Sequence, residues 1–226
     1  MSAAEPEPDP DTSSTAATTS SAAETTQKPP KRSWVGEVNE LISRVKLDEN
    51  GNVPTKPFLD VAERFPRIFD IVFGEGRVSN HLKSDVGGNV DSLHTIYKAN
   101  PAVFETLDQT PELSAGIEGR VKLLWLQRGL MWIFKLVQDL LSKPNDEVTT
   151  IAWESYEKSL GKHHNWFVRK FVGVAFSVAP DRVDLLNAFG LSESRFQKEG
   201  KVFVESFAPI IMIVNRWLVQ QKLETE

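Results

Sequence analysis

Asp85 and Asn89 lie four positions apart in a segment whose apolar spacing predicts a helix. At about 100° per residue, their side chains point within roughly 40° of each other. A carboxylate accepts hydrogen bonds and a carboxamide both donates and accepts them, so the pair suits the hydroxyl groups of a sugar. Gly87 and Gly88 between them cost a helix interior about 1–2 kcal/mol relative to alanine. That cost is understandable if a sugar or a neighbouring helix approaches the backbone there.

The same residues have a simpler interpretation. On a helical wheel, Ser92 lies within roughly 20° of Asp85. Leu82, Val86 and Leu93 lie at roughly 60–100° from Asp85, so the polar strip follows the edge of an apolar face. The solvated border of an ordinary amphipathic helix therefore stays open as an alternative.

A second candidate is His164, which we predict to lie within an apolar helical stripe. The other members of that stripe lie within about 40° of it: Leu160, Val168, Phe171 and Ala175. A buried neutral imidazole has one donor and one acceptor and needs partners for both. His164 therefore either bonds a backbone carbonyl in the core or donates to an amide or ester carbonyl of a ligand in a cavity.

Two tryptophans lie near these candidates. Trp166 is predicted on the outer side of the helix that carries His164, close to three cations: Lys162, Arg169 and Lys170. An amphipathic indole beside cations suits the headgroup level of a bilayer, and packing beneath another helix is the alternative. Trp125 is by default a core aromatic residue. With Gly129 one turn further on, it also has the space to present a ring face to a sugar.

From Trp34 onward, apolar side chains recur with a 3.6-residue period, which predicts an all-α domain. Helices are expected over residues 34–47, 57–73 with a bend at Pro66, 80–98, 117–141, 146–162, 163–178 and 180–189, with a short one after Pro101 and a last one from Ser192 kinked at Pro209. The helix over 117–141 is apolar on two faces, and such a helix normally lies between two layers of others. We therefore predict a two-layer helical sandwich of about eight helices.

Residues 1–31 are rich in Ala, Ser, Thr, Glu and Pro and contain no Val, Ile, Leu or aromatic side chain. Such an acidic, Ser/Thr/Pro-rich segment cannot repay the entropy of ordering, so we predict a disordered tail. Residues 32–226 have the size of a single domain. The chain start lacks the features of a signal peptide, and the apolar runs over 123–141 and 207–219 are interrupted by polar, charged or proline residues. We expect a cytoplasmic protein without a membrane span.

The composition excludes several classes of function. A net charge of −5 and a pI near 5.5 do not provide the dense positive surface that nucleic-acid binding needs. The absence of cysteine excludes disulfides, thiolate metal sites and cysteine nucleophiles. The motifs G-x-S-x-G, H-E-x-x-H, the P-loop and G-x-G-x-x-G do not occur. We therefore expect no enzyme, no cofactor and no metal.

Four motifs in order, over about Thr55 to Gly190, together resemble the glycolipid transfer proteins. They are Asp85-x-x-x-Asn89, Trp125-Leu126-x-Arg128-Gly129-Leu130, His164-x-Trp166 and Ala179-Pro180. The resemblance implies a two-layer all-α fold and an intracellular, non-vesicular carrier of sphingolipids with sugar head groups. Members of the family bind one lipid and release it at membranes. We expect a glycosphingolipid ligand, transient contact with the cytosolic face of membranes, and a monomer.

The resemblance also implies roles for single residues. Asp85 would hold the sphingoid amide N–H and a sugar hydroxyl, and Asn89 would bond further hydroxyls. Trp125 would be the platform for the first sugar, His164 would donate to the acyl-amide carbonyl, and Arg128 would brace the head-group site. Docking on the membrane would fall to Trp166 and the cations around it: Lys162, Arg169 and Lys170.

The head-group positions favour a sugar over a phosphate. The ceramide-1-phosphate branch of the family has cations near the positions of Asn89 and Trp125, and both are uncharged here. Ser92 borders the proposed head-group site where the glycolipid branch usually has Lys or Arg. We therefore expect a simple neutral glycosylceramide. A ceramide-1-phosphate carrier, a lipid sensor or scaffold that does not transfer, and a hydrolase using His164 and Asp85 as acid and base remain alternatives.

Overall fold

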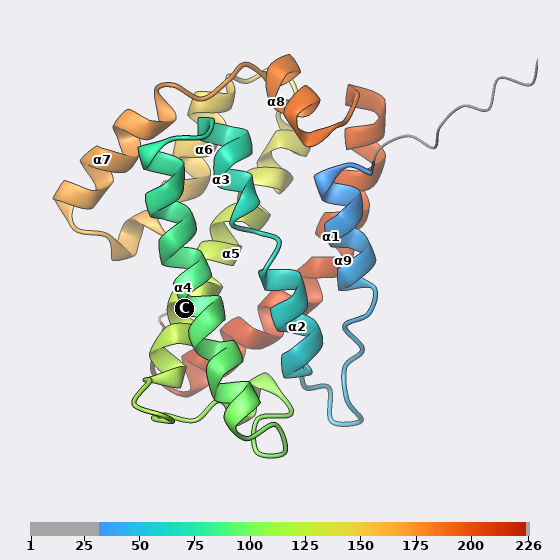
Figure 1. Cartoon of the computed structure of the whole chain (residues 1–226). Helices are drawn as coiled ribbons and strands as arrows, with labels where there is room; N and C mark the ends of the chain where they lie inside the picture. The colour runs from blue at the N-terminus through green and yellow to red at the C-terminus, as the bar shows by residue number, and fades with distance from the viewer. Residues whose placement is uncertain (1–31, 225–226) are drawn as a thin grey trace, which may run out of the picture. The chain divides into compact units, whose positions relative to one another are not determined.

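The computed structural model describes residues 32–224, and their regular structure is helical, as predicted (Figure 1). In chain order the helices are α1 (Trp34–Ile42), α2 (Thr55–Ala62), α3 (Arg67–Phe73), α4 (Arg77–Ala99), η1 (Leu107–Gln109), α5 (Gly119–Ser142), α6 (Val148–Glu157), η2 (Gly161–His163), α7 (Trp166–Phe176), α8 (Arg182–Phe189) and α9 (Glu193–Gln220). Over residues 32–224 there is no β-strand, only two isolated bridges. The predicted tail over 1–31 lies outside the described residues.

The helices form two layers around α5. Helices α1, α2, α3 and α4 contact one another in one layer, and α5 packs with α6 and α9 in the other. The layers meet where α1 lies on α9 and α4 lies on α5 (Figure 1). Helix α5 therefore has neighbours on both of its apolar faces, as the two-layer prediction requires.

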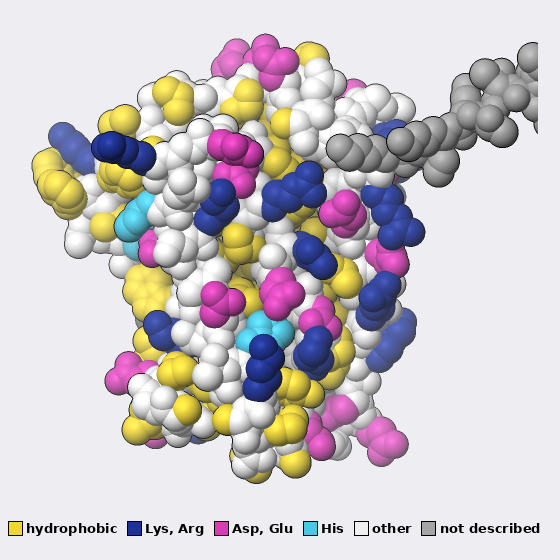
Figure 2. All heavy atoms as spheres, in the orientation of Figure 1, with side chains coloured by type: hydrophobic (Ala, Val, Ile, Leu, Met, Phe, Trp, Pro, Cys, Tyr) yellow, Lys and Arg dark blue, Asp and Glu magenta, His cyan; other side chains and the backbone are white. Residues whose placement is uncertain are grey.

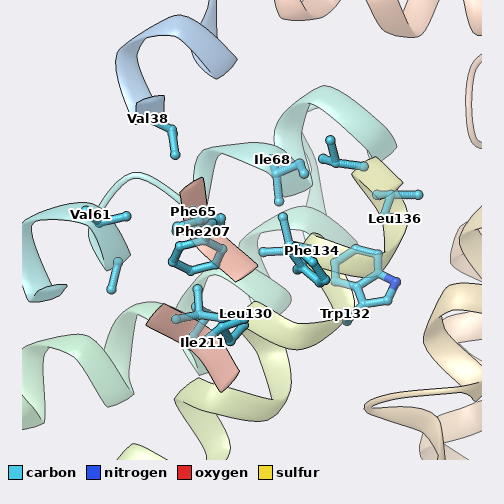
Figure 3. Close-up of a cluster of buried hydrophobic side chains, with 14 of the residues drawn as sticks. Val38, Val61, Phe65, Ile68, Leu130, Trp132, Phe134, Leu136, Phe207 and Ile211 are labelled. Atoms are coloured by element: carbon cyan, nitrogen blue, oxygen red, sulfur yellow. The ribbon is translucent and has the colours of Figure 1, made fainter. Parts of the chain in front are cut away.

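Aromatic side chains fill the core between the layers (Figure 3). The rings of Phe65 and Phe207 stack with centroids 5.4 Å apart, and the ring of Phe134 on α5 lies 6.5 Å from that of Phe207. Each fully buried side chain of this size contributes roughly 1.5–3 kcal/mol through burial alone. This cluster fixes α5 against α9 and thereby fixes the side of α5 that faces α4.

Helix α9 is long and apolar enough, by length and composition, to cross a membrane; its most apolar 18 residues have a mean hydropathy of 1.6. One face of the helix is nevertheless buried in the core: Phe196, Phe203, Phe207, Ile210, Ile211, Val214 and Leu218. The exposed side carries charged residues, including the Lys201–Glu205 pair. Because its apolar face packs against α1 and α5, we assign α9 to the core.

Two expected helix boundaries are wrong. The helix expected over 57–73 is two helices, because the chain turns after Ala62 and restarts with Pro66 at the N-cap of α3. Proline disfavours a helix interior, since it lacks an N–H group and its ring clashes with the preceding turn. Helix α9 nevertheless continues through Pro209, where a kink was expected. The helix expected over 34–47 ends at Ile42. After it, Val45 still packs into the core from an irregular segment.

The segment around His164 also differs from the prediction. Helix α6 ends at Glu157, and α7 begins only after Asn165, whose side chain accepts a hydrogen bond from the Val168 N–H at 3.0 Å. His164 lies between the two helices with extended backbone, φ −92° and ψ 140°. The prediction of a helical stripe containing His164 is therefore wrong. Because Asn165 caps the helix, α7 starts at Trp166 and not at the predicted residue 163.

Candidate functional site

A cavity of about 760 Å³ lies between α3, α4, α5, α6 and α7. Its lining includes exposed or half-buried side chains that can form hydrogen bonds or carry charge, among them Ser84, Asp85, Asn89, Lys122, Trp125 and His164. It also includes buried apolar side chains, namely Phe69, Trp132, Val172 and Phe176, together with the partly buried Phe73. The cavity therefore combines accessible polar groups with a buried, largely aromatic interior, as a site for an amphiphilic molecule requires.

The structure brings together four of the predicted site residues: Asp85, Asn89, Trp125 and His164 all line this cavity, although they come from α4, α5 and the segment before α7. Ser92 does not line it; the Ser92 hydroxyl donates to the carbonyl of Gly88 at 2.6 Å. Other predicted site residues, namely Arg128, Lys162, Trp166, Arg169 and Lys170, also lie outside the lining.

The Asp85 carboxylate is accessible and has few partners. Its side chain is 66% exposed, and the His81 imidazole lies close to it, with Nε2 3.8 Å from a carboxylate oxygen. Asn89 Nδ2 donates to the backbone carbonyl of Asp85 at 2.9 Å. A Cβ added at Gly87 or Gly88 would meet nothing within 4 Å, and Gly88 lines the cavity. Neither glycine is therefore required by a neighbouring helix, and the space that Gly88 leaves beside α4 faces the cavity.

Trp125 is held in a stack of charged and aromatic groups. Its ring lies at 20° to that of His164 with centroids 5.9 Å apart, and the Arg128 guanidinium lies 4.9 Å from its centroid. Arg128 Nε in turn donates to Glu224 at 2.7 Å, and both of these side chains are largely buried. Because the guanidinium is already paired, it orients the indole and is not a free cation in the cavity.

His164 has a side-chain partner at Nδ1. The Tyr156 hydroxyl lies 2.8 Å from this nitrogen, and the tautomer of the ring decides which of the two groups donates. Burial raises the pKa of Tyr156 to about 12, so the hydroxyl keeps its proton at neutral pH. In the tautomer with its hydrogen on Nε2, Nδ1 accepts from the hydroxyl and Nε2–H is left as a donor. The partner of Nδ1 is a side-chain hydroxyl and not a backbone carbonyl.

Burial also lowers the pKa of His164, with a smaller opposing effect of Asp85 and a further lowering by Arg128. The neutral imidazole is therefore the form that the folded protein favours.

We expect this burial to appear in the pH dependence of stability. The unfolded chain binds a proton at His164 more readily than the folded chain, so the unfolding free energy should fall as pH drops below about 6.5. In His164→Asn this loss is absent, so the stability difference between wild type and variant should shrink between pH 7.5 and pH 5.5. Urea denaturation at pH 7.5 and at pH 5.5 measures the unfolding free energies from which this difference is taken. Exposed His81→Asn is the control, and an equal change in both variants would contradict the assignment.

Helix α7 presents an apolar surface beside the cavity. Trp166 is 68% exposed, and Phe167, Phe171, Val174 and Val178 are exposed with it. Lys170 Nζ lies 4.6 Å from the Trp166 ring centroid, whereas Arg169 is paired with Glu157 and Lys162 is exposed. Phe167 and Phe171 also line the cavity, so this surface adjoins its opening.

Several residues of the site were missed by sequence reasoning. Lys122 lies three positions before Trp125, so helical spacing places it on the same face of α5 and would have found it. Tyr156 contacts His164 from eight positions earlier, across the irregular turn between α6 and α7, and Glu224 contacts Arg128 from 96 positions away. No helical pattern signals either contact.

One group of possible metal ligands lies on α2, α4 and the residue after α2. Ligand atoms of Asp60, Glu63 and His94 lie within 4.8 Å of one another. Existing pairs account for them, because His94 Nε2 lies 2.7 Å from Glu63 and Asp60 is paired with Lys56. We assign no metal to this group.

The chain has clear relatives of known name. A family model described as glycolipid transfer protein matches residues 53–191. The glycolipid transfer protein of Danio rerio is 32% identical over 167 residues, which cover 68% of this chain and 78% of that protein. The family-model match spans α2 to α8 and includes the whole of the cavity lining.

Solved structures at lower identity share the fold. The structure described as showing how FAPP2 selects simple glycosphingolipids using the GLTP-fold superposes with a TM-score of 0.74 at 22% identity, over 85% of this chain and 98% of that chain. Human ceramide-1-phosphate transfer protein with 12:0 ceramide-1-phosphate superposes with a TM-score of 0.72 at 18% identity, over 83% and 96% of the two chains. At these identities the superpositions establish the architecture and leave the head group open.

Proposed function

Because this chain belongs to the glycolipid transfer protein family, whose members are lipid transfer proteins and not enzymes, we propose that it carries a sphingolipid with a simple neutral sugar head group between membranes. The observation that supports this proposal is the cavity itself. A carboxylate, a carboxamide, an indole and an imidazole are accessible groups of its lining, and buried aromatic side chains line its interior. One lipid would place its sugar among the accessible polar side chains and its ceramide chains in the buried aromatic interior.

Each polar group has a partner in such a ligand. Asp85 accepts hydrogen bonds from the sphingoid amide N–H and from a sugar hydroxyl, and Asn89 bonds further hydroxyls. His164 donates from Nε2 to the acyl-amide carbonyl, since its Nδ1 is occupied by Tyr156. Trp125 offers the ring surface that faces the cavity to the first sugar, while Arg128 holds the indole. Together these contacts recognise the amide and the sugar at once.

The charges of the accessible polar side chains favour a sugar over a phosphate. Asp85 is the acidic residue of the lining, and it would repel a phosphate monoester that carries close to two negative charges. Arg128 is neutralised by Glu224, and burial keeps His164 in its neutral form. Lys122 alone does not balance a dianion beside a carboxylate. A ceramide-1-phosphate carrier is therefore the less favoured reading.

Selectivity must come from these polar contacts. Some 30 methylene groups in two chains amount to about 20 kcal/mol relative to water. A bilayer solvates the chains nearly as well, so their movement into the cavity is close to an exchange. A buried polar group left without a partner costs about 1–3 kcal/mol, and lipids that lack the amide would leave Asp85 and His164 in that state.

The apolar surface of α7 is the proposed membrane contact. Figure 2 shows hydrophobic side chains beside Lys and Arg side chains at the left edge of the molecule, where Figure 1 places α7. An indole with a neighbouring ammonium suits the headgroup level of a bilayer. Because Phe167 and Phe171 belong both to this surface and to the cavity lining, a docked lipid would have a continuous apolar path inwards. Docking at the cytosolic face of membranes by a cytoplasmic monomer is part of the proposal.

Trp166→Ala is expected to weaken membrane docking selectively. Loss of an exposed indole from the surface should reduce partitioning onto phosphatidylcholine vesicles several-fold, because the ring supplies amphipathic area at the interface. Binding of a soluble short-chain glycolipid should change less than twofold. Vesicle sedimentation measures the partitioning onto vesicles, and tryptophan fluorescence titration measures the binding of the short-chain glycolipid. Met212→Ala, which removes an exposed side chain from α9, is the control. Equal losses of vesicle and ligand binding in Trp166→Ala would argue against docking.

Transfer of a fluorescent galactosylceramide between vesicles tests the function. The proposal predicts faster movement of galactosylceramide than of ceramide-1-phosphate. The opposite preference would identify a ceramide-1-phosphate carrier. Binding without transfer would indicate a sensor or scaffold, and turnover of the lipid would indicate a hydrolase.

A further inference from the structure

Trp132 places a hydrogen-bond donor in the apolar wall of the cavity. The residue is 2% exposed and lines the cavity together with Phe69 and Phe176, whose ring centroids lie 5.5 and 5.8 Å from its own. Figure 3 shows the indole nitrogen on the side of the ring turned away from Phe207. Among the described residues, 32–224, its Nε1–H has no hydrogen-bond partner. The wall therefore contains an unsatisfied donor.

An equally buried indole elsewhere in the domain is satisfied. Trp34 is also 2% exposed, and its Nε1 donates to the backbone carbonyl of Arg64 at 3.0 Å. Native proteins rarely leave a buried donor unpaired, and each exception calls for an explanation. A water molecule would need at least about two polar partners, whereas the ring neighbours of Trp132 are phenylalanines. An acceptor that arrives with the ligand explains the donor better.

Helical geometry gives the depth at which this acceptor would lie. Trp132 follows Trp125 by seven positions on α5, so both side chains leave the helix on nearly the same face, about 10 Å apart along its axis. That distance corresponds to roughly eight carbons of an extended chain. In the function proposed above, His164 holds the acyl-amide carbonyl, and its ring stacks on Trp125. The acyl chain therefore begins beside α5 at the level of Trp125 and passes Trp132 about eight carbons further on.

We propose that Trp132 forms a polar subsite within the apolar interior, and that it selects an acyl chain with a hydroxyl group near its eighth carbon. This inference rests on the function proposed above. The hydroxyl oxygen accepts from Nε1–H. In the hydrocarbon of a bilayer the same hydroxyl lacks a partner, so its movement into the cavity gains a hydrogen bond. Because Nε1 is shielded from solvent, the entering chain must shift neighbouring side chains, a change that is common on binding.

The test measures which acyl chain the protein removes from a membrane. Phosphatidylcholine vesicles contain equal amounts of galactosylceramide with a stearoyl chain and with a stearoyl chain hydroxylated at the eighth carbon. Native mass spectrometry of the full chain compares the two adducts. Wild type is expected to favour the hydroxylated lipid about fivefold, the ratio that one net hydrogen bond gives. Trp132→Phe keeps an aromatic ring without the donor and should lose this preference.

Trp34→Phe is the matched control. It replaces an equally buried indole outside the cavity lining, and the Arg64 carbonyl loses its donor. The variant should therefore be less stable and should keep the preference of about fivefold. In wild type, a hydroxyl near the end of the acyl chain should give no preference, because it would lie beyond Trp132.

A nuclear magnetic resonance spectrum of wild type gives a second readout, which applies even if Trp132→Phe does not fold. The indole N–H signal of Trp132 should move to lower field when the hydroxylated lipid replaces the unsubstituted one, because a hydrogen bond deshields the proton. The signal of Trp34 should not move, since its N–H is already bonded to Arg64.

The results separate this inference from the proposed function. If wild type takes up galactosylceramide with no preference for the hydroxylated chain, or if Trp132→Phe keeps the preference, Trp132 is not a polar subsite and the proposed function stands. An unchanged indole signal of Trp132 would overturn the inference as well. If wild type takes up neither lipid, both proposals fail together.

Discussion

Asp85→Val is expected to slow intervesicle transfer of galactosylceramide about 100-fold, to near the spontaneous rate. The variant loses the acceptor for the sphingoid amide N–H and for a sugar hydroxyl. Hydrogen bonds to a charged group contribute about 1.5–3 kcal/mol each, and about 3 kcal/mol corresponds to a factor of roughly 100. The substitution also leaves the ligand amide without a partner in an apolar setting, which adds to the loss.

The fold should survive this change. The Asp85 side chain is 66% exposed, and its one ion-pair contact over residues 32–224 is with the exposed His81 imidazole at 3.8 Å. Far-ultraviolet circular dichroism should therefore match wild type. Asp91→Val is the matched control, because Asp91 is exposed on the same helix and does not line the cavity. Wild-type transfer by Asp85→Val, with correct folding, would remove Asp85 from the site.

Trp125→Ala should slow the same transfer about 30-fold. Truncation of a central aromatic side chain typically costs about 2 kcal/mol of binding, which corresponds to that factor. Two groups lose their ring neighbour at the same time, namely His164 and the Arg128 guanidinium. The loss should therefore affect the orientation of the amide donor as well as the sugar platform. Intervesicle transfer and the Kd for a soluble glycolipid measure the effect.

A second tryptophan separates this effect from loss of stability. Trp217→Ala removes a half-buried indole from α9 that contacts Arg120 outside the cavity. Trp217→Ala is expected to lower stability with little change in transfer at a temperature where it is folded. Trp125→Phe should recover part of the transfer rate, because it restores a smaller ring. If Trp125→Ala and Trp217→Ala lose transfer equally, Trp125 has no specific contact with the sugar.

The parts of the site that share one helix could be predicted from the sequence. The helical period predicted that Asp85 and Asn89 share one face of α4, and the structure shows that this face lines the cavity. The glycines between them also indicated an approach to the backbone, and the structure places open space there. The position of α5 between two layers follows from its two apolar faces, because each face must pack against other helices.

The parts of the site that depend on irregular backbone could not be predicted. His164 reaches the cavity from an extended segment, and its partner Tyr156 comes from another helix. Gly161 makes this turn possible, because a Cβ there would lie 2.9 Å from the Tyr156 ring. Helical periodicity placed His164 among apolar side chains that do line the cavity, although its backbone is extended and not helical. The salt bridge between Arg128 and Glu224 spans 96 positions, and no local pattern encodes it.

Native mass spectrometry of the full chain, mixed with vesicles that contain galactosylceramide, ceramide-1-phosphate and phosphatidylcholine in equal amounts, shows which lipid the cavity selects. We expect a single added mass, equal to one galactosylceramide per chain, that is lost in Asp85→Val and retained in Asp91→Val. Capture of ceramide-1-phosphate or phosphatidylcholine instead, or an equal galactosylceramide adduct in Asp85→Val, would contradict a cavity that selects its lipid through the amide and the sugar.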